Sequence, residues 1–416
     1  MIVFKFGGAS VKDAESVKNV GEIVKKYDDK LVVVISAMGK TTNLLEKLIK
    51  AYFINDENKW EIFTQFKNYH SEITSDLFGD TEQPDVLELY SELEKKLNKN
   101  PTTDINYEYD QIICFGELLS TTIISHYLNS ININNNWIDI RNCLKTDRKY
   151  REANVDWGES EILINNEFNF NNSQRYITQG FIGSDKNGIS TSLGREGSDF
   201  TGAILGNILD ADYVAIWKDV PGVLNADPKQ MEATTKLDEL SYREAIEMSH
   251  SGAKIIHPKT IKPLHNKNIP LHVKSFLNPD SEGTIIHPVK HTLDLSPVYI
   301  IKENQVLITL SPNDFSFIGV EDITQVFDLL AKNRFKINLF QQSAIDLNLV
   351  VDYPENDLNE TIEKLMSLYE VKYNTGLELA TIRFYNDKAI TNFTKGKKVF
   401  IEQKSRRTAR LIIKKN

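Results

Sequence analysis

The sequence predicts an α/β protein with a mainly parallel central sheet between helices, followed by a smaller α+β unit. The chain opens with an apolar strand at residues 2–6 that ends in two glycines, then a helix at about 13–27 and a second apolar strand at 31–36. This order is typical of a parallel sheet that is buried on both faces. Beyond residue 298 the order becomes strand, helix, strand, strand, helix, strand, which is typical of a ferredoxin-like unit.

The middle of the chain continues the α/β pattern. Residues 44–98 have helical periodicity with Glu and Lys on the polar face, and we interpret them as a helical insertion that forms a lid on the substrate side. Further strands are expected at residues 137–139, 175–179, 213–217 and 271–275, with helices at 198–209 and 242–251.

A boundary is expected at residues 282–297, where Gly283, Pro288 and Pro297 interrupt a polar segment. We therefore predict a catalytic domain at residues 1–290 and a second region at 298–416. The second region should have strands at 305–310, 336–340, 347–352 and 377–384, and helices at 321–333 and 358–369. Residues 397–414 alternate basic and apolar side chains and are expected to supply two more strands of a short, incomplete second unit.

Composition excludes several classes of protein. Lys and Arg number 49 against 58 Asp and Glu, so the net charge of −9 disfavours binding to nucleic acid or anionic membranes. The apolar run at residues 31–38 is far shorter than a membrane span, and the N-terminus lacks the pattern of a signal peptide. Two cysteines, Cys114 and Cys143, give no disulfide framework and agree with a reducing cytoplasm.

Two glycine-containing turns are candidate anion sites. Lys5-Phe-Gly-Gly-Ala-Ser10 follows the first strand, where backbone amides can approach a phosphate and Lys5 can contact phosphoryl oxygens. A tight turn with a solvated lysine explains the hexapeptide equally well. The loop at residues 191–199 combines Arg195, which can clamp a carboxylate, with Ser198 and Asp199, although an ordinary helix cap also explains that pair.

Two later segments extend this set. Residues 216–229 follow a buried strand and contain Pro-Gly and Asp-Pro turns, and ligands of open α/β sheets bind at such strand ends. Residues 252–258 end a helix with a glycine and are expected to lead into another strand. Lys254 in this segment either faces a nucleotide or neutralises the helix C-terminus.

These segments together resemble the ordered motifs of the aspartokinases, which belong to the amino acid kinase family. The resemblance covers residues 1–290, and the tail is similar to the ACT regulatory domains of that family. It implies the amino acid kinase fold and ATP-dependent phosphorylation of the L-aspartate β-carboxylate, a first step toward lysine, threonine and methionine. The six motifs begin at Lys5, Ser36, Phe115, Leu193, Lys218 and Gly252.

The resemblance also implies roles for individual residues. Lys5 and Asp199 would be catalytic, with the Gly7-Gly8 amides holding the γ-phosphoryl group. Three hydroxyl residues, Ser36, Thr42 and Ser198, would bind the β-carboxylate of aspartate. Arg195 would bind its α-carboxylate, and Glu117 with Asp199 would bind its α-ammonium. The nucleotide side would be formed by Gly7, Gly8, Ser10, Lys218, Asp219, Asp227, Lys229 and Lys254. Mg²⁺ would arrive with ATP, because it keeps waters and binds phosphate oxygens. The histidines, His257 included, lack metal-ligand spacing and are interpreted as structural or solvated.

Some positions depart from the family pattern. Glu196 stands where glycine is usual and adds a negative charge near an anionic substrate, while Lys218 replaces threonine and Leu224 replaces tyrosine. Lys229, in place of arginine, loses the fork geometry. We expect these changes to affect nucleotide affinity or selectivity.

The regulatory region departs further. Relatives that respond to lysine have acidic residues where this chain has Asn338 and Ala344, so weak or absent inhibition by lysine is expected. We also expect a homodimer through residues 298–416, because small sheets have edges to cover.

Two alternatives remain open at this point. Another acyl-phosphate or nucleotide kinase of the same fold, such as a glutamate, acetylglutamate or uridylate kinase, would share the glycine turns. A non-catalytic amino-acid-sensing paralogue would retain the tail, although intact Lys5, Glu117 and Arg195 argue against it. A fused homoserine dehydrogenase is not expected, because no GxGxxG unit follows residue 300.

Overall fold

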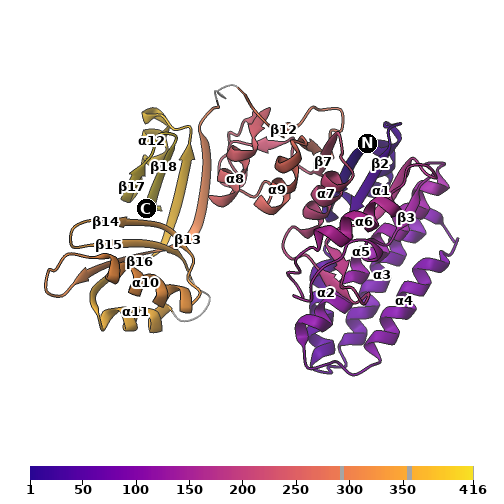
Figure 1. Ribbon diagram of the computed structural model, residues 1–416, viewed down its shortest axis with the longest axis horizontal. Helices are drawn as coiled ribbons and strands as arrows, with labels where there is room; N and C mark the ends of the chain where they lie inside the picture. The colour runs from indigo at the N-terminus through magenta and orange to yellow at the C-terminus, as the bar shows by residue number, and fades with distance from the viewer. Residues whose placement is uncertain (291–294, 354–357, 416) are drawn as a thin grey trace. The chain divides into compact units, whose positions relative to one another are not determined.

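The structure is a computed structural model that describes residues 1–290, 295–353 and 358–415. It comprises two compact units (Figure 1). The first contains Met1–Val223, Lys236–Ser249 and the segment that begins at Lys254, and the second contains Leu224–Thr235, His250–Ala253 and the C-terminal segment. Residues 291–294 of the expected boundary lie outside the described residues.

An eight-stranded sheet forms the centre of the first unit. All of its strand pairs are parallel except β11 with β12. Every residue of the central strands β1 and β2 is buried, because helices cover both faces. The strand order is β10 (Glu239–Ser241), β12 (Thr284–His287), β11 (Leu271–Ser275), β7 (Tyr213–Lys218), β1 (Ile2–Phe6), β2 (Leu31–Ile35), β4 (Arg175–Gln179) and β3 (Asn136–Ile138).

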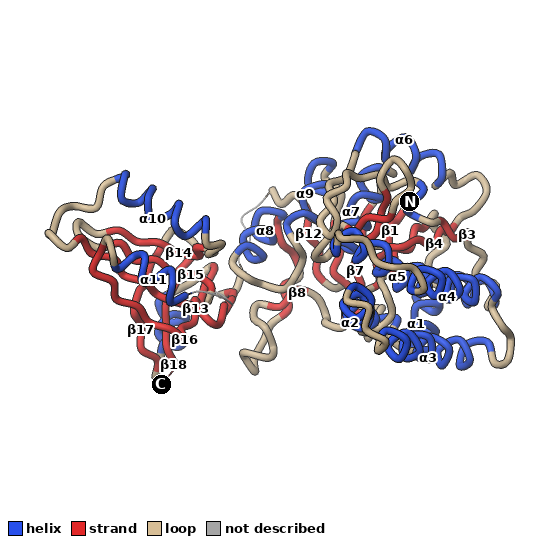
Figure 2. Tube along the Cα trace, turned by 90° about the horizontal axis from the view of Figure 1, so that it is seen from below, coloured by secondary structure: helices blue, strands red, loops and turns tan. Residues whose placement is uncertain are grey.

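Helices form a layer on each side of this sheet (Figure 2). One layer contains α6 (Trp157–Glu167), α7 (Gly197–Ile208) and α9 (Pro258–Lys267). The other contains α1 (Ala14–Lys25), α2 (Thr41–Phe53), α3 (Lys59–Phe78), α4 (Pro84–Leu97) and α5 (Ile105–Ser130). The remaining short elements before residue 290 are η1 (Gly8–Val11), η2 (Ile140–Asn142), β5 (Ile182–Ser184), β6 (Ser190–Ser192), β8 (Val223–Leu224), β9 (Lys236–Leu237) and α8 (Tyr242–His250).

The predicted fold class is confirmed, and two local expectations need correction. The segment 252–258 does not lead into a strand, because Pro258 begins α9 with His257 as its N-cap. The long helix α5 was not predicted, since most of its residues are buried on all sides and leave no amphipathic pattern. Of the residues 44–98 interpreted as a lid, Glu46 of α2 lines the cavity described below, whereas α3 and α4 contribute none of its lining residues.

The second unit is built on a six-stranded antiparallel sheet. Its first four strands have the order β14-β15-β13-β16, which is the ferredoxin-like order. The sequence elements are β13 (Val298–Pro312), α10 (Val320–Lys332), β14 (Ile337–Gln342), β15 (Leu347–Asp352), α11 (Leu358–Met366), β16 (Tyr369–Arg383), α12 (Asp387–Thr394), β17 (Lys397–Lys404) and β18 (Thr408–Lys415).

Two strands of this sheet are longer than predicted. β13 and β16 each run through both halves of the sheet, and their register shifts near Asn304, which has a left-handed backbone with φ 54°. One half packs against α10 and α11 through residues such as Val326, Leu330 and Leu365. The other half pairs with β18 and packs against α12 through Ile390 and Phe393. The two expected C-terminal strands, β17 and β18, are present.

Candidate active site

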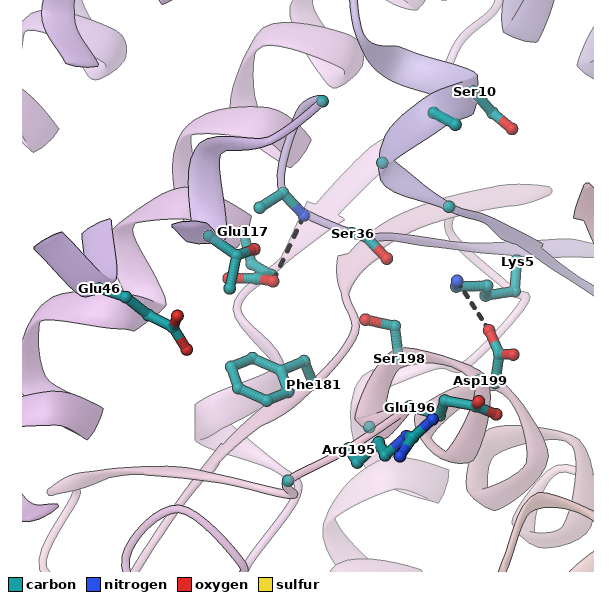
Figure 3. Close-up of a pocket in the computed structure, with 18 of the residues that line it drawn as sticks. Lys5, Ser10, Ser36, Glu46, Glu117, Phe181, Arg195, Glu196, Ser198 and Asp199 are labelled. Carbon is teal, nitrogen blue, oxygen red and sulfur yellow. Dashed lines mark hydrogen bonds and ion pairs between the residues drawn. The ribbon is translucent and has the colours of Figure 1, made fainter. Parts of the chain in front are cut away.

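A cavity of about 900 Å³ lies in the first unit, at the carboxyl ends of neighbouring parallel strands. Gly7 follows β1, Ser36 follows β2, Phe181 lies just beyond β4, and Lys218 ends β7. In open α/β sheets this edge is where ligands bind, because loops from several strands converge there. The topology therefore brings distant sequence motifs into one site (Figure 3).

A buried aspartate lies between two lysines in this cavity. Lys5 Nζ is 2.7 Å from Asp199 Oδ1 (Figure 3), and Lys218 Nζ is 3.9 Å from Asp199 Oδ2. Burial by itself raises the pKa of Asp199, but the charges of Lys5 and Lys218 outweigh it and hold the pKa below its ordinary value. The cluster therefore contains two ammonium groups and one carboxylate, and its net positive charge favours an anionic ligand.

The glycine turn after β1 packs against the turn after β2. A Cβ on Gly8 would lie only 2.7 Å from the carbonyl oxygen of Ala37 and 2.9 Å from that of Gly39, so no larger residue fits without a shift. A Cβ on Gly7 would lie 3.5 Å from Lys5 Nζ. Because neither glycine carries a side chain, a ligand can approach the backbone beside the lysine closely.

Glu117 reaches the cavity from the interior of α5. Its Oε1 accepts a hydrogen bond from the Ala37 amide at 3.3 Å, while its buried Oε2 has no partner among the described residues. Burial raises the pKa of Glu117 to about 8, despite the Ala37 hydrogen bond and the charge of Lys5. A buried oxygen without a partner is costly, so this geometry suits a donor group supplied by a ligand.

The start of α7 and the loop just before it supply three further residues, Arg195, Glu196 and Ser198. Ser198 lies against Gly180, where a Cβ would come within 2.5 Å of the serine Cβ, so the loop after β4 fixes the position of the hydroxyl. Arg195 is exposed and has no carboxylate partner among the described residues. Its guanidinium is therefore available to an anion from solution.

Glu196 has the left-handed backbone that favours glycine, with φ 54°. Its Oε2 accepts a hydrogen bond from the His257 amide at 2.9 Å. The carboxylate that departs from the family pattern is thus paired with the backbone next to α9. Of the other departures, Lys218 Nζ also donates to the Ile255 carbonyl oxygen at 2.5 Å, and Leu224 belongs to the second unit.

Most of the predicted site residues line this one cavity. They are Lys5, Gly7, Gly8, Ser10, Ser36, Thr42, Glu117, Arg195, Ser198, Asp199, Lys218 and Asp219. Three predicted nucleotide-side residues do not line it. Asp227 and Lys229 belong to the second unit, and Lys254 lies in the first unit outside the lining.

Sequence reasoning missed several lining residues. Asn106 and Tyr109 come from α5, Glu46 from α2, Tyr150, Arg151 and Glu152 from one loop, and Phe181 from the turn after β4. Phe181 has φ 70°, and the Gln179-Gly180 end of the predicted strand was the available signal for it. The loop residues had no such signal, because their position depends on contacts with α5.

Known proteins resemble this chain in sequence and in fold. A model of the amino acid kinase family matches residues 1–275. The lysine-sensitive aspartokinase 3 of Escherichia coli is 30% identical over 355 residues, which are 85% of this chain and 78% of that protein. A bifunctional aspartokinase/homoserine dehydrogenase of Arabidopsis thaliana is 29% identical over 90% of this chain, which spans only 42% of that relative.

Solved structures show the same likeness. The crystal structure of E. coli aspartokinase III with aspartate and ADP has a TM-score of 0.81 and 26% identity, and the match covers 99% of this chain and 96% of that one. The aspartate kinase of Clostridium acetobutylicum, at 22% identity and a TM-score of 0.83, shares the fold. The chain belongs to the amino acid kinase family and, within it, to the aspartokinases.

Within residues 1–290, 295–353 and 358–415, no group of three or more His, Cys, Asp or Glu is arranged to hold a metal ion. In the same part of the chain, no helix is long and apolar enough to cross a membrane.

Proposed function

We propose that this protein transfers the γ-phosphoryl group of ATP to the β-carboxylate of L-aspartate, producing 4-phospho-L-aspartate and ADP. The observation that carries the proposal is that one cavity combines the Lys5–Asp199–Lys218 cluster with Arg195 and the open oxygen of Glu117. The first set suits a phosphoryl group, and the second suits an amino acid with free α groups. An α-ammonium satisfies the Glu117 oxygen, and an α-carboxylate pairs with Arg195.

The reacting carboxylate lies between these two sets of residues. Ser36, Thr42 and Ser198 carry hydroxyls that donate hydrogen bonds to it, and Lys5 neutralises the charge that repels it from the γ-phosphate. The nucleophile is already an anion, so the transfer requires alignment and charge neutralisation and no general base. Asp199 holds the Lys5 ammonium in place for this task.

The nucleotide side consists of the Gly7 and Gly8 backbone, Ser10, Lys218 and Asp219 in the cavity, and of Asp227, Lys229 and Lys254 by resemblance to the family. The close approach that the glycines permit fits a phosphate chain. Mg²⁺ keeps most of its waters and binds mainly phosphate oxygens, so it would be carried by ATP instead of by a protein site. When bound, the ion neutralises charge on the phosphates.

A coupled assay tests the reaction. Purified protein with Mg·ATP should release ADP when L-aspartate is added and much less when L-glutamate is added, and hydroxylamine should trap the acyl phosphate as a hydroxamate. The Lys5→Ala variant should lose about 100-fold or more of the turnover, because one cation at the transferring group is removed. ADP release without hydroxamate, or equal turnover of Lys5→Ala, would contradict the proposal.

We further propose that residues 298–416 are an ACT-like regulatory region through which two copies form a homodimer in the cytoplasm. The ferredoxin-like strand order and the outer strands β14 and β17 support pairing at sheet edges. The buried, unpaired thiols of Cys114 and Cys143 agree with a reducing compartment. Sedimentation of the full chain measures the assembly, and a monomer at micromolar concentration would contradict the dimer.

A further inference from the structure

The loop at residues 147–154 is held in one conformation at its base. Asp147 Oδ1 accepts from the Asn154 amide at 2.9 Å and from the Lys149 amide at 3.1 Å, and its Oδ2 accepts from the Asn154 side chain at 2.7 Å. The Asp147 amide in turn donates to the Asn154 carbonyl oxygen. Tyr150 and Arg151 therefore belong to a loop whose two ends are joined by hydrogen bonds between Asp147 and Asn154.

A buried carboxylate fixes the backbone at Arg151. Asp110 is fully buried, and its Oδ2 accepts from the Arg151 amide at 3.0 Å and from the Ser192 amide at 2.9 Å. Its Oδ1 accepts from the Ser192 hydroxyl at 2.5 Å. Arg151 itself has φ 70°, a backbone that a residue with a Cβ adopts only when its surroundings hold it there.

The Arg151 side chain is placed by an aromatic ring. Its guanidinium carbon lies 4.3 Å from the centre of the Tyr109 ring, and the Tyr109 hydroxyl donates to Glu46 Oε1 at 3.2 Å. Stacking on the ring leaves the edges of the guanidinium free to donate hydrogen bonds. Tyr109 lies on α5, the same helix that carries Glu117, so Arg151 approaches the cavity from the amino acid side.

In the part of the chain that the structure describes, the guanidinium of Arg151 forms no ion pair, although its charge acts on the Asp110 carboxylate. Arg151 lines the same cavity as Arg195, and among the described residues neither arginine has a carboxylate partner. L-Aspartate brings two carboxylates, of which the β-carboxylate must face Lys5 for the transfer. The α-carboxylate is therefore the anion that remains for the two arginines.

We propose that Arg151 is a specificity-determining residue that binds the α-carboxylate of the acceptor together with Arg195. This inference rests on the proposed aspartate kinase reaction and deepens it. A rigid loop, a buried carboxylate that fixes the backbone, and an aromatic ring that orients the guanidinium all position one cation. Acceptors without the α-carboxylate gain nothing from it.

The test compares Arg151→Ala and Arg151→Lys with the wild-type chain. Arg151→Ala should raise the KM for L-aspartate about tenfold, with kcat and the KM for ATP within about twofold, because a contact to the acceptor that is equally strong in the ground state and the transition state is lost. The KM of Arg151→Lys for L-aspartate should lie between those of wild type and Arg151→Ala, since an ammonium keeps the charge but loses the fork geometry and the stacking of a guanidinium. Lys149→Ala is the control, because this exposed lysine belongs to the same loop and does not line the cavity.

A second acceptor identifies the contact. The α-amide of L-aspartate keeps the β-carboxylate and the ammonium but lacks the α charge, so its KM should be the same for wild type and Arg151→Ala. An unchanged KM for aspartate in both variants, an equal rise for the α-amide, or a rise in the KM for ATP instead would overturn the inference. Failure of the wild-type chain to use aspartate at all would instead overturn the proposed function, and the inference with it.

Discussion

A cluster of buried and half-buried polar side chains in the second unit and the polar cavity of the first unit differ in how completely their members bond to one another. In the second unit, Asp352 Oδ1 accepts from Gln305 at 2.9 Å and from Asn338 at 2.7 Å, and it is 2.7 Å from Lys302 Nζ. Asn338 also donates to Gln305 and accepts from Lys302. Every member of this cluster is bonded to another member.

The cavity of the first unit is different. The Oε2 of Glu117 has no partner among the described residues, and the guanidiniums of Arg151 and Arg195 have no carboxylate there. The Glu117 oxygen is buried, and a buried polar atom without a partner is costly unless a ligand completes it, whereas the two guanidiniums are exposed and stay hydrated until an anion binds. The comparison teaches that an open polar group indicates a binding site when it also lines a cavity, as Glu117 does, whereas the bonded cluster of the second unit has no such open member.

The largest effect is expected from Asp199→Asn, which removes the negative charge between Lys5 and Lys218. Turnover should fall about 100-fold or more, because the Lys5 ammonium is no longer held toward the transferring group. Steady-state kinetics with aspartate and ATP measures this. Asp280→Asn, at an exposed pair with Lys26, is the matched control and should change turnover less than about twofold. Similar losses in both variants would refute the assignment.

The next effect concerns the open oxygen of Glu117. Since burial raises its pKa to about 8, the free protein keeps this carboxyl mostly protonated at neutral pH, and an ammonium ligand must displace that proton. Affinity for aspartate should therefore rise as the pH rises toward 8, by up to about tenfold per unit. Glu117→Gln should raise the KM for aspartate at pH 8 about tenfold and abolish the pH dependence. A wild-type KM that is flat between about pH 6 and 8 would contradict this.

A smaller effect, on stability, is expected from disrupting the polar cluster around Asp352 in the second unit. Asp352→Asn should lower the free energy of unfolding by about 1 kcal/mol at pH 7, because Lys302 loses its ion pair and the site is partly exposed. Burial opposes ionisation, but hydrogen bonds from Gln305 and Lys302 prevail and lower the pKa of Asp352 below its ordinary value of 3.8.

The sign of the pH effect follows from that pKa. The folded-state pKa lies below the unfolded one, so the contribution of Asp352 is fully present above about pH 4 and is lost as the pH falls further. Urea denaturation of both proteins at pH 7 and at pH 3 measures it. A difference that persists unchanged at the lower pH would show that the charge of Asp352 is not the cause.

The smallest effect is expected from added lysine. Asn338 and Ala344 carry no charge, and Asn338 already bonds to Gln305 and Asp352, so an effector ammonium finds no free carboxylate there. Initial rates with lysine and threonine, singly and together, should remain near the uninhibited rate. Half-inhibition by lysine below about 1 mM, as a lysine-sensitive enzyme would show, is the contrary outcome.

Much of the fold could be predicted because local patterns agree with the tertiary structure. The predicted strands at residues 175–179, 271–275 and 347–352 agree with β4, β11 and β15, since alternation or continuous burial between turns is a local property. The helix α5 could not be recognised by the same logic, because a helix buried all round carries no period. The helix α9 was missed because residues 252–258 were expected to lead into a strand, although Pro258 is the first residue of a helix.

The candidate site divides in a similar way. Residues in compact motifs after strands, such as Lys5, Ser36 and Lys218, line the cavity because the strand order places their strand ends together. Arg151 could not be found from the sequence, because its place depends on the Asp110 carboxylate of a distant helix. The left-handed backbone at Glu196 could not be predicted from the residue itself either, because glutamate, unlike glycine, does not indicate a positive φ.

The path of the chain between the two units has a practical consequence. Residues 224–235 and 250–253 belong to the second unit although the sequence on either side of them belongs to the first. A truncated chain that stops near residue 290 would therefore contain residues 224–235 and 250–253 without the rest of the second unit, to which they belong. Proteolytic cleavage or fusion at that junction would leave these two internal segments without their folding partner. Activity measurements on this enzyme therefore require the full-length chain.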